Sequence, residues 1–283
     1  MRLRVLIVGA GGFLGGRLLQ SDDARVELIA TRSSDCNVTD RTSVHNAFEQ
    51  SRPDVAVLTA ALADIDRCEQ EPALAHAVNV TGAENVAREC ARIGARLLFT
   101  SSGAIFDGTA SQYRESDPPH PLSVYGKTKA EAERVIREIV PDAIVARLSL
   151  ALGFSRAGGT NALLDKLPSA FQSGRPVSAA ADEFRNAIDA ETLVHWMLDL
   201  ACTPEANGVF HLGSSDAMSR YEIVSRLAEA MGFSKGQVID ARSPGRAPRG
   251  RRHMLVPTRI RKYSNTPIPT CAEAIERCIH VPA

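Results

Sequence analysis

The sequence has few of the features that mark membrane-spanning, secreted or nucleic-acid-binding proteins. Its 283 residues carry no formal net charge, because 33 lysines and arginines balance 33 aspartates and glutamates. This balance, with 44% hydrophobic residues, disfavours disorder and a general nucleic-acid-binding surface. No uncharged apolar run approaches the roughly 20 residues that span a bilayer. Five glycines among positions 9–16 break the apolar start of the chain, which therefore does not resemble a signal peptide. We expect a cytoplasmic protein that binds neither membranes nor nucleic acid.

Paired cysteines and metal-ligand motifs are also missing. The six cysteines contain no CxxC pair, and neither they nor the seven histidines show the spacing of a metal site. Free cysteine commonly behaves as a small buried hydrophobe. We therefore expect no metal, and a reduced chain with these cysteines in its core: Cys36, Cys68, Cys90, Cys202, Cys271 and Cys278.

Short apolar runs and helical patterns alternate regularly over the first 150 residues. Apolar runs at 3–8 and 26–30 flank a helical pattern at 13–20, and the same order repeats further along the chain. Such alternation is typical of a parallel sheet with helices on both faces. We predict an α/β fold, with a doubly wound Rossmann-type domain over residues 1–150. Residues 151–283 follow with a looser pattern.

Some helices are predicted from their ends. A long helix is expected from about residue 72 to residue 92. Ser219 with Glu222, and Thr270 with Glu273, have capping-box spacing, in which a hydroxyl and a carboxylate satisfy the free amides of a helix start. Two late helices should therefore begin at these places.

A glycine-rich turn joins the first predicted strand to the first predicted helix. Gly9, Gly12 and Gly15 form GxxGxxG. At this place a dinucleotide-binding fold needs a tight turn, close approach of the backbone to a pyrophosphate, and a helix N-terminus that faces the phosphates. We therefore expect this turn, together with Phe13 and Leu14, to bind a dinucleotide cofactor.

The end of the second predicted strand bears on the choice of cofactor. NAD-binding units place an acidic residue there to bond the ribose hydroxyls, whereas this chain has Arg32 followed by Ser33. A guanidinium beside hydroxyls suits a 2′-phosphate. NADP(H) is therefore favoured over NAD(H), and a solvated surface arginine is the alternative. Glu27 is discounted because it lies inside the predicted strand.

A tyrosine and a lysine share one face of a helix predicted near residues 124–139. Tyr125 and Lys129 stand four residues apart, which places them on the same side. A phenol needs a nearby cation to lower its pKa, and Lys129 can supply it. Ser101 and Ser102 follow a predicted strand, where open α/β sheets bind ligands. The pattern indicates a catalytic site; a structural tyrosine with a surface lysine is the alternative.

Residues 241–262 form a basic segment that holds no acidic side chain. Arginine binds phosphate oxygens through paired hydrogen bonds, so this segment suits an anionic ligand such as a nucleotide diphosphate. A solvated loop is the alternative. Its eight basic residues are Arg242, Arg246, Arg249, Arg251, Arg252, Arg259, Arg261 and Lys262.

Several motifs together resemble the extended short-chain dehydrogenases/reductases. They are the glycine turn, TSSGAIFDG at 100–108, YGKTK at 125–129 and RLSLALG at 147–153. The resemblance is closer still to the dTDP-4-dehydrorhamnose reductase family and covers nearly the whole chain. It rests on DRCEQEP at 66–72, Asn79, ADEFRNAIDAETL at 181–193 and FHLGSSDAMSRYEI at 210–223.

This resemblance implies an activity, an organisation and a site. The activity is NADPH-dependent reduction of a keto group on a nucleotide-linked sugar, and a homodimer is compatible with it. Residues 151–283 would mainly bind substrate, while about 187–212 would return to the Rossmann sheet. The implied catalytic set is Ser102, Tyr125 and Lys129. Implied cofactor contacts are Gly9, Gly12, Phe13, Leu14, Gly15, Arg32, Ser33, Ala60, Ala61, Tyr125 and Lys129. Implied substrate contacts are Gly103, Ala104, Leu150, Arg185, Arg249 and Arg251.

The chain also departs from its resembling families. Where such reductases usually carry Thr-Asp-Tyr-Val-Phe, residues 102–106 read Ser-Gly-Ala-Ile-Phe, and Leu150 replaces a usual tryptophan. Both changes would reshape the sugar pocket. Two alternatives therefore stay open. One is a non-catalytic NADP-binding regulatory subunit, because the β subunit of methionine adenosyltransferase shares the DxFRN pattern at 182–186. The other is a related epimerase or dehydratase.

Overall fold

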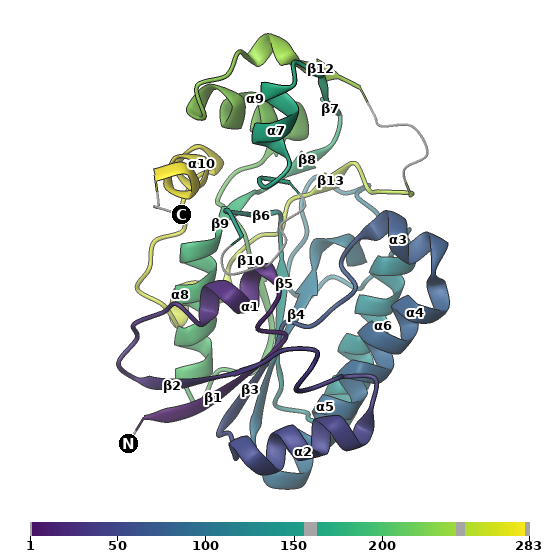
Figure 1. The fold of residues 1–283 in the computed structure, drawn as a ribbon, viewed down its shortest axis with the longest axis vertical. Helices are drawn as coiled ribbons and strands as arrows, with labels where there is room; N and C mark the ends of the chain where they lie inside the picture. The colour runs from purple at the N-terminus through teal and green to yellow at the C-terminus, as the bar shows by residue number, and fades with distance from the viewer. Residues whose placement is uncertain (1, 156–162, 242–246, 281–283) are drawn as a thin grey trace.

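The computed structural model describes residues 2–155, 163–241 and 247–280, and these residues build a central parallel sheet of six strands (Figure 1). The strand order is β10-β5-β4-β3-β1-β2. The chain runs outward from β1 in both directions, so the sheet is doubly wound and its switch point lies between β1 and β3. The predicted Rossmann-type fold is confirmed. The strands are β1 (Leu3–Val8), β2 (Val26–Thr31), β3 (Val55–Leu58), β4 (Arg96–Ser102), β5 (Ile144–Leu148) and β10 (Gly208–Leu212).

Helices cover both faces of this sheet because side chains along each strand alternate in direction. In β1, Val5 and Ile7 belong to one buried core, whereas Leu6 and Val8 belong to another. The first core lies under α1 (Phe13–Leu18) and α8 (Ala190–Cys202). The second lies under α2 (Arg41–Ser51), α5 (Gly82–Ile93) and α6 (Val124–Ile139).

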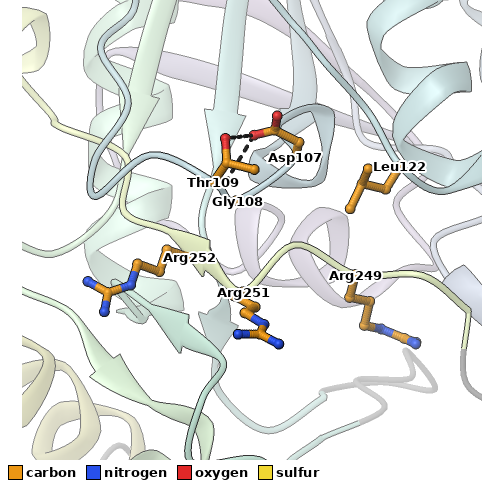
Figure 2. Close-up of a pocket in the computed structure, with 7 residues that line it drawn as sticks. All are labelled: Asp107, Gly108, Thr109, Leu122, Arg249, Arg251 and Arg252. Carbon is orange, nitrogen blue, oxygen red and sulfur yellow. Dashed lines mark hydrogen bonds between the residues drawn. The ribbon is translucent and has the colours of Figure 1, made fainter.

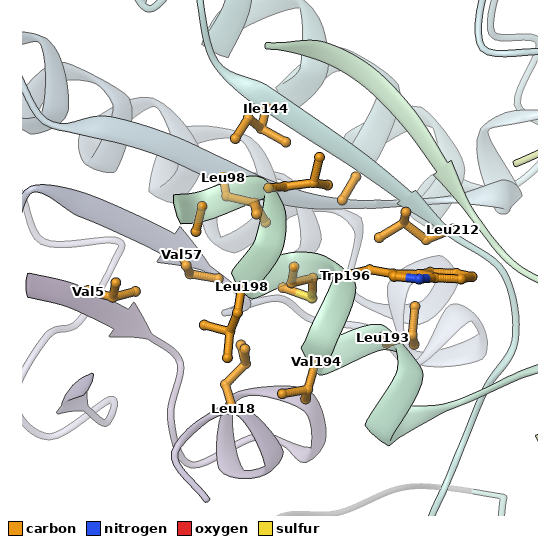
Figure 3. Close-up of a cluster of buried hydrophobic side chains, with 14 of the residues drawn as sticks. Val5, Leu18, Val57, Leu98, Ile144, Leu193, Val194, Trp196, Leu198 and Leu212 are labelled. Atoms are coloured by element: carbon orange, nitrogen blue, oxygen red, sulfur yellow. The ribbon is translucent and has the colours of Figure 1, made fainter. Parts of the chain in front are cut away.

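The first core is built around α8, which comes from the second half of the chain (Figure 3). Trp196 on α8 is fully buried, and its indole Nε1 donates a hydrogen bond to the Thr266 carbonyl at 3.2 Å. The strand after α8 is β10, which pairs in parallel with β5 so that Phe210 lies opposite Ala146. Residues 190–212 thus add a helix and an edge strand to the sheet built by the first 150 residues.

The helix expected over residues 72–92 is interrupted. The segment passes from α4 (Pro72–His76) through a π-helical turn (Ala77–Thr81) into α5. A π turn changes the direction of the side chains that follow it and is often found at functional sites. The chain also forms a short α3 (Ile65–Gln70), capped by the side chain of Asp64, that is too short to be predicted from apolar periodicity.

The remaining second half forms a third core. It is built by α7 (Leu167–Gln172), α9 (Arg220–Ala230) and α10 (Cys271–His280), beside a small sheet of β7 (Val177–Ala179) and β12 (Val238–Asp240). Both predicted capping boxes are confirmed. The Ser219 hydroxyl accepts from the Glu222 amide at 3.1 Å, and the Thr270 hydroxyl accepts from the Glu273 amide at 3.2 Å.

Five of the six cysteines are buried as predicted, Cys202 is half-buried, and all six are free thiols. Within the described ranges, no group of three or more histidine, cysteine or acidic side chains is placed to hold a metal ion. No helix in the same ranges has both the length and the apolar surface that a bilayer crossing requires.

Candidate active site

The glycine turn holds β1, β3 and α1 in backbone contact. Gly9 has a φ of +102°, and a Cβ added to it would lie 2.5 Å from the amide nitrogen of Ala60. A Cβ on Gly15 would collide with the carbonyl oxygen of Gly9. The amide of Gly12, which caps α1, donates to the same carbonyl at 3.0 Å. Packing and backbone conformation therefore require glycine at positions 9 and 15.

The neighbours of this turn lie at the switch point of the sheet. Phe13 begins α1, and a Cβ on Gly153 would lie 3.0 Å from the Phe13 ring. Leu14 lies partly buried against the first core. Ala60 and Ala61 follow β3 and are half-buried. The predicted cofactor contacts from β1, α1 and β3 thus come together at one end of the sheet.

Arg32 lies exposed beside the glycine turn. A Cβ on Gly11 would lie 3.8 Å from Arg32 Cγ, so the start of the arginine side chain lies next to the turn. Asp35, which no sequence pattern indicates, accepts through its carboxylate from the Arg32 amide at 3.1 Å and from the Ser34 hydroxyl at 2.9 Å. These two hydrogen bonds lower the pKa of Asp35, so an ionised carboxylate lies against the Arg32 backbone.

Ser102 and Tyr125 meet because the start of α6 packs tightly on the turn after β4. Ser102 ends β4, and its hydroxyl accepts from the Ala104 amide at 3.1 Å. A Cβ on Gly126 would collide with the carbonyl oxygen of Ala104, so the α6 backbone closely approaches this turn. The α6 start is fixed by Ser123, whose hydroxyl accepts from the Gly126 amide at 3.1 Å. The Tyr125 phenol is hydrogen-bonded to the Ser102 side chain.

Burial drives Tyr125 and Lys129 toward their uncharged forms. Burial raises the pKa of Tyr125 to about 12, although the hydrogen bond to Ser102 opposes this shift. The expectation of a lowered phenol pKa is therefore wrong, because desolvation outweighs the hydrogen bond to Ser102, the one contribution that lowers this pKa. Burial also lowers the pKa of Lys129 to about 7, against the attraction of the Glu133 carboxylate. The Lys129 ammonium lies 4.2 Å from the centre of the Phe99 ring.

Asn79, in the π-helical turn, connects α6 to the segment after β3. Its side-chain amide donates to the Thr128 hydroxyl at 3.0 Å, and that hydroxyl donates to the Tyr125 carbonyl at 2.9 Å. Asn79 also accepts from the Leu62 amide at 2.8 Å. The π turn thus directs an amide side chain onto the helix that carries Tyr125 and Lys129.

A hollow of about 490 Å³ lies between the turn after β4 and part of the basic segment (Figure 2). Gly108 has a φ of +75°, and a Cβ on it would lie 2.6 Å from the Arg251 amide nitrogen. The Arg252 amide donates to the Gly108 carbonyl at 3.3 Å. The hollow is lined by Asp107, Gly108, Thr109, Leu122, Arg249, Arg251 and Arg252.

The arginines of this segment have different partners. Arg249 forms a two-point ion pair with Asp66 on α3, at 3.0 and 2.9 Å. Arg251 is largely exposed and lies 3.7 Å from Asp182. Arg252 lies 4.9 Å from the centre of the Phe184 ring. Arg242 and Arg246 lie outside the described residues.

The other predicted substrate residues lie at varying depth. Arg185 is buried in β8 (Phe184–Arg185), next to β13 (Arg252–His253), and its guanidinium donates to the carbonyls of Phe184, Gly250 and Arg251. Arg185 thus holds the basic segment in place. Gly103 faces Leu255, Ala104 packs near Tyr125, and Leu150 packs against the third core.

The parallel doubly wound sheet, with its glycine turn at the switch point, defines an α/β protein of the Rossmann type. More narrowly, the chain belongs to the RmlD substrate binding domain family, whose model matches residues 2–282.

Individual relatives cover most of the chain. SpsK of Bacillus subtilis (strain 168), a spore coat polysaccharide biosynthesis protein, is 33% identical over 81% of this chain and 80% of its own length. A dTDP-4-dehydrorhamnose reductase of Mycolicibacterium smegmatis is 27% identical over 99% of this chain and 86% of its own length. Methionine adenosyltransferase 2 subunit beta of Xenopus laevis is 30% identical over 80% of this chain and 72% of its own length. Among solved structures, the dTDP-4-dehydrorhamnose reductase of Bacillus anthracis, in complex with NADP, superposes with a TM-score of 0.90 at 22% identity, over 98% and 99% of the two chains.

Proposed function

We propose that this protein is an NADPH-dependent reductase of a keto group on a nucleotide-linked sugar. The observation that carries the proposal is the meeting of Ser102 and Tyr125, with Lys129 one helical turn away, at the carboxyl end of β4. Open α/β sheets bind ligands at this end. The resemblance to proteins named dTDP-4-dehydrorhamnose reductase supports the reaction class.

The residues at the switch point fit a dinucleotide with a 2′-phosphate. Gly9 and Gly15 leave no room for side chains in the turn, and the exposed Arg32 lies next to it. These residues, with Phe13, Ser33 and Ala60, would hold the cofactor, and the Bacillus anthracis reductase structure, which is a complex with NADP, supports this choice. When bound, NADPH supplies a hydride to the carbonyl carbon.

The chain's own residues would handle the proton and the carbonyl oxygen. Tyr125 keeps its proton at neutral pH, because its pKa is raised to about 12. The neutral phenol therefore has a proton to donate. Ser102 is hydrogen-bonded to that phenol and would orient the substrate oxygen. Lys129, buried on the same face of α6, would stabilise the phenolate that proton donation leaves behind. Arg249, Arg251 and Arg252, at the hollow beside Leu122, would bind the anionic part of the substrate.

Replacement of the phenol tests this proposal. Tyr125→Phe should keep the fold and NADPH affinity but lose about 10²–10⁴-fold in turnover, because it removes the general acid. NADPH oxidation is followed by absorbance against 4-keto nucleotide sugars and simpler ketones. The matched control is Tyr263→Phe, whose ring packs on Phe210 at the edge of the sheet; it should turn over at the wild-type rate. Wild-type turnover by Tyr125→Phe would refute the assignment.

A regulatory subunit is the second candidate, because methionine adenosyltransferase 2 subunit beta is 30% identical over 80% of this chain. Tight NADPH binding without reduction of any carbonyl compound, together with a stable protein partner in pull-downs, would favour it over the reductase.

A cytoplasmic location and a homodimer are further parts of the proposal. Six free thiols suit a reducing compartment. Light scattering on the purified protein measures its mass and so tests the homodimer.

A further inference from the structure

A buried ion pair lies next to Tyr125 and Lys129, on the same face of α6. Glu133 follows Lys129 by four residues and so lies one turn away on the same face. Its partner is Arg147 on β5, and the Arg147 Nη2 lies 2.8 Å from Glu133 Oε2. Lys129, Glu133 and Arg147 are 1%, 4% and 3% exposed. Three charged side chains thus share one buried region next to the proposed catalytic residues.

Hydrogen bonds fix the Glu133 carboxylate in this region. The Ser101 hydroxyl donates to Glu133 Oε1 at 2.5 Å, and Ser101 directly precedes Ser102 on β4. Arg147 Nε donates to both carboxylate oxygens, at 3.1 and 3.2 Å. Arg147 is itself held by the Glu115 carbonyl at 3.3 Å and by the Phe106 ring, whose centre lies 5.4 Å away. The carboxylate therefore has little freedom to move away from α6.

The surroundings of Lys129 leave Glu133 as its source of negative charge. The titratable and charged groups around the lysine are Tyr125 and Glu133 on its own helix, Cys68 on α3, and Arg147 on β5 beyond Glu133. Burial favours the neutral amine, while the Glu133 carboxylate favours the ammonium. Burial raises the pKa of the Cys68 thiol to about 11, so this thiol is uncharged at neutral pH. On α3 the apolar Ile65 and the Cys68 thiol pack with Tyr125.

We propose that Glu133 is a positioning residue that favours the charged form of Lys129, and that Arg147 limits the strength of this effect. The inference rests on the proposed role of Lys129. An isolated buried ammonium has a lowered pKa and loses its proton readily. An ammonium facing a buried carboxylate that has no other partner would have a raised pKa and keep its proton. Burial lowers the pKa of Lys129 to about 7, and the Glu133 carboxylate opposes this lowering. Since Arg147 lies 2.8 Å from the same carboxylate, it would weaken the opposition. The lysine is thus able to respond to charge that develops on the phenol.

The test measures the titration of Lys129 itself. The sequence contains only five lysines, so NMR of protein labelled at lysine Cε resolves each, and Lys129→Met assigns the signal. In wild type the pKa of Lys129 should lie at about 7. Glu133→Gln should lower it by about one pH unit, because the attracting charge is lost while Arg147 remains. Glu133→Gln with Arg147→Gln should lower it less, because the repelling charge is lost as well.

The control is Glu138→Gln on the same helix, because Glu138 is exposed and pairs with Arg134 at 2.7 Å. It should leave the Lys129 titration unchanged. The double variant also guards against misfolding, because it removes both buried charges together and keeps groups that form hydrogen bonds. The inference is overturned if Lys129 titrates at the wild-type pH in Glu133→Gln or, where that variant does not fold, in the double variant.

A kinetic readout follows from the same argument. If the ammonium is the active form, kcat/KM falls as pH rises through the pKa of Lys129. In Glu133→Gln this fall should occur at lower pH than in wild type, while the effect of Glu138→Gln should be nil. The proposed reductase function and the proposed role of Glu133 are refuted by different results. A protein without reductase activity refutes the proposed function, whereas the NMR titration decides the role of Glu133 in the absence of any cofactor.

Discussion

Tyr125 and Lys129 lie in the same buried region, and burial affects them in opposite senses. It raises the pKa of the phenol to about 12 and lowers the pKa of the ammonium to about 7. The first shift keeps a proton on Tyr125 at every pH near neutrality, which suits a donor in the direction of reduction. The second leaves Lys129 between its two charge states. Helical spacing predicts that these two residues share a face, but it does not show how deeply they are buried. The direction of the pKa shift of the phenol is therefore not predictable from the spacing.

Arg32 gives a prediction about cofactor choice. Arg32→Ala should weaken NADPH binding at least tenfold and leave NADH binding unchanged, because a charged hydrogen bond to the 2′-phosphate contributes about 1.5–3 kcal/mol. Fluorescence titration of both reduced cofactors measures this. Arg52→Ala, at an exposed position after α2, is the control. Equal affinity of the wild-type protein for the two cofactors would contradict the prediction.

Asp35 and Glu133 show which single residues the sequence analysis overlooked. Glu133 lies four residues beyond Lys129, so the spacing that revealed the Tyr125–Lys129 pair also marks it. Its significance depends on Arg147, which only the pairing of β4 with β5 brings near. Asp35 stands three residues beyond Arg32 in a turn whose course no periodic pattern describes.

Among the elements, the basic segment differs most from its expected form. Arg249 is engaged by Asp66 of α3, and the Ala247 amide donates to the same carboxylate at 2.7 Å. The segment is therefore tied to the cofactor-binding half by one of the arginines expected to contact substrate. Arg251 and Arg252, on the other side of Gly250, make no such two-point ion pair among the described residues. They are the stronger candidates for a phosphate contact.

The replacement of Arg251 and Arg252 together by alanine tests this distinction. The double variant should bind uridine or thymidine diphosphate at least tenfold more weakly, because two charge-assisted contacts are lost. Thermal shift at low and high salt measures the effect, which should shrink as salt screens the charges. The control replaces Arg88 and Arg134 by alanine, because each of these arginines forms an exposed ion pair within its own helix, α5 and α6 respectively. A double variant that keeps the full ligand-induced shift would show that the segment is only a solvated loop.

Elements with strong local signals were predicted well. The helix expected near residues 124–139 is α6, and two capping boxes marked α9 and α10. The π turn at Ala77–Thr81 was not predicted, because one inserted residue hardly disturbs a helical period over twenty residues. Yet this turn places Asn79 against Thr128 and so contributes to the site.

For the whole molecule, two buried histidines predict how stability depends on pH. Burial lowers the pKa of both His211 and His253 to about 3, assisted by Arg147 and Arg185 respectively. The unfolded chain takes up these protons near pH 6.5. Stability from the neutral rings is therefore fully present above pH 6.5 and is lost as pH falls toward 3.

Between pH 7 and pH 5 the free energy of unfolding should fall by on the order of 2 kcal/mol for each of these histidines. Urea denaturation at the two pH values measures the change. His253→Gln should reduce the difference between the two values, whereas His195→Gln, at an exposed position, should not. An unchanged difference in His253→Gln would contradict the argument.

At the scale of the whole molecule, the parallel, doubly wound type of the sheet was predictable, and the long-range pairs were not. Alternating strands and helices fix a parallel, doubly wound sheet. The contact of Arg249 with Asp66 joins positions 183 residues apart, and no local pattern encodes it. Such pairs depend on how the second half of the chain lies on the first.

The late position of α8 and β10 has a consequence for synthesis of the protein. The ribosome makes β5 well before β10, which begins only at residue 208. Until then the emerging chain carries an unpaired sheet edge and an apolar face that only the short α1 covers in part, and both invite aggregation. Chaperones that bind nascent chains should therefore engage this protein at the stage when β5 has left the exit tunnel. Trp196, the single tryptophan of the sequence, enters that face when α8 docks, so its fluorescence reports the completion of the sheet.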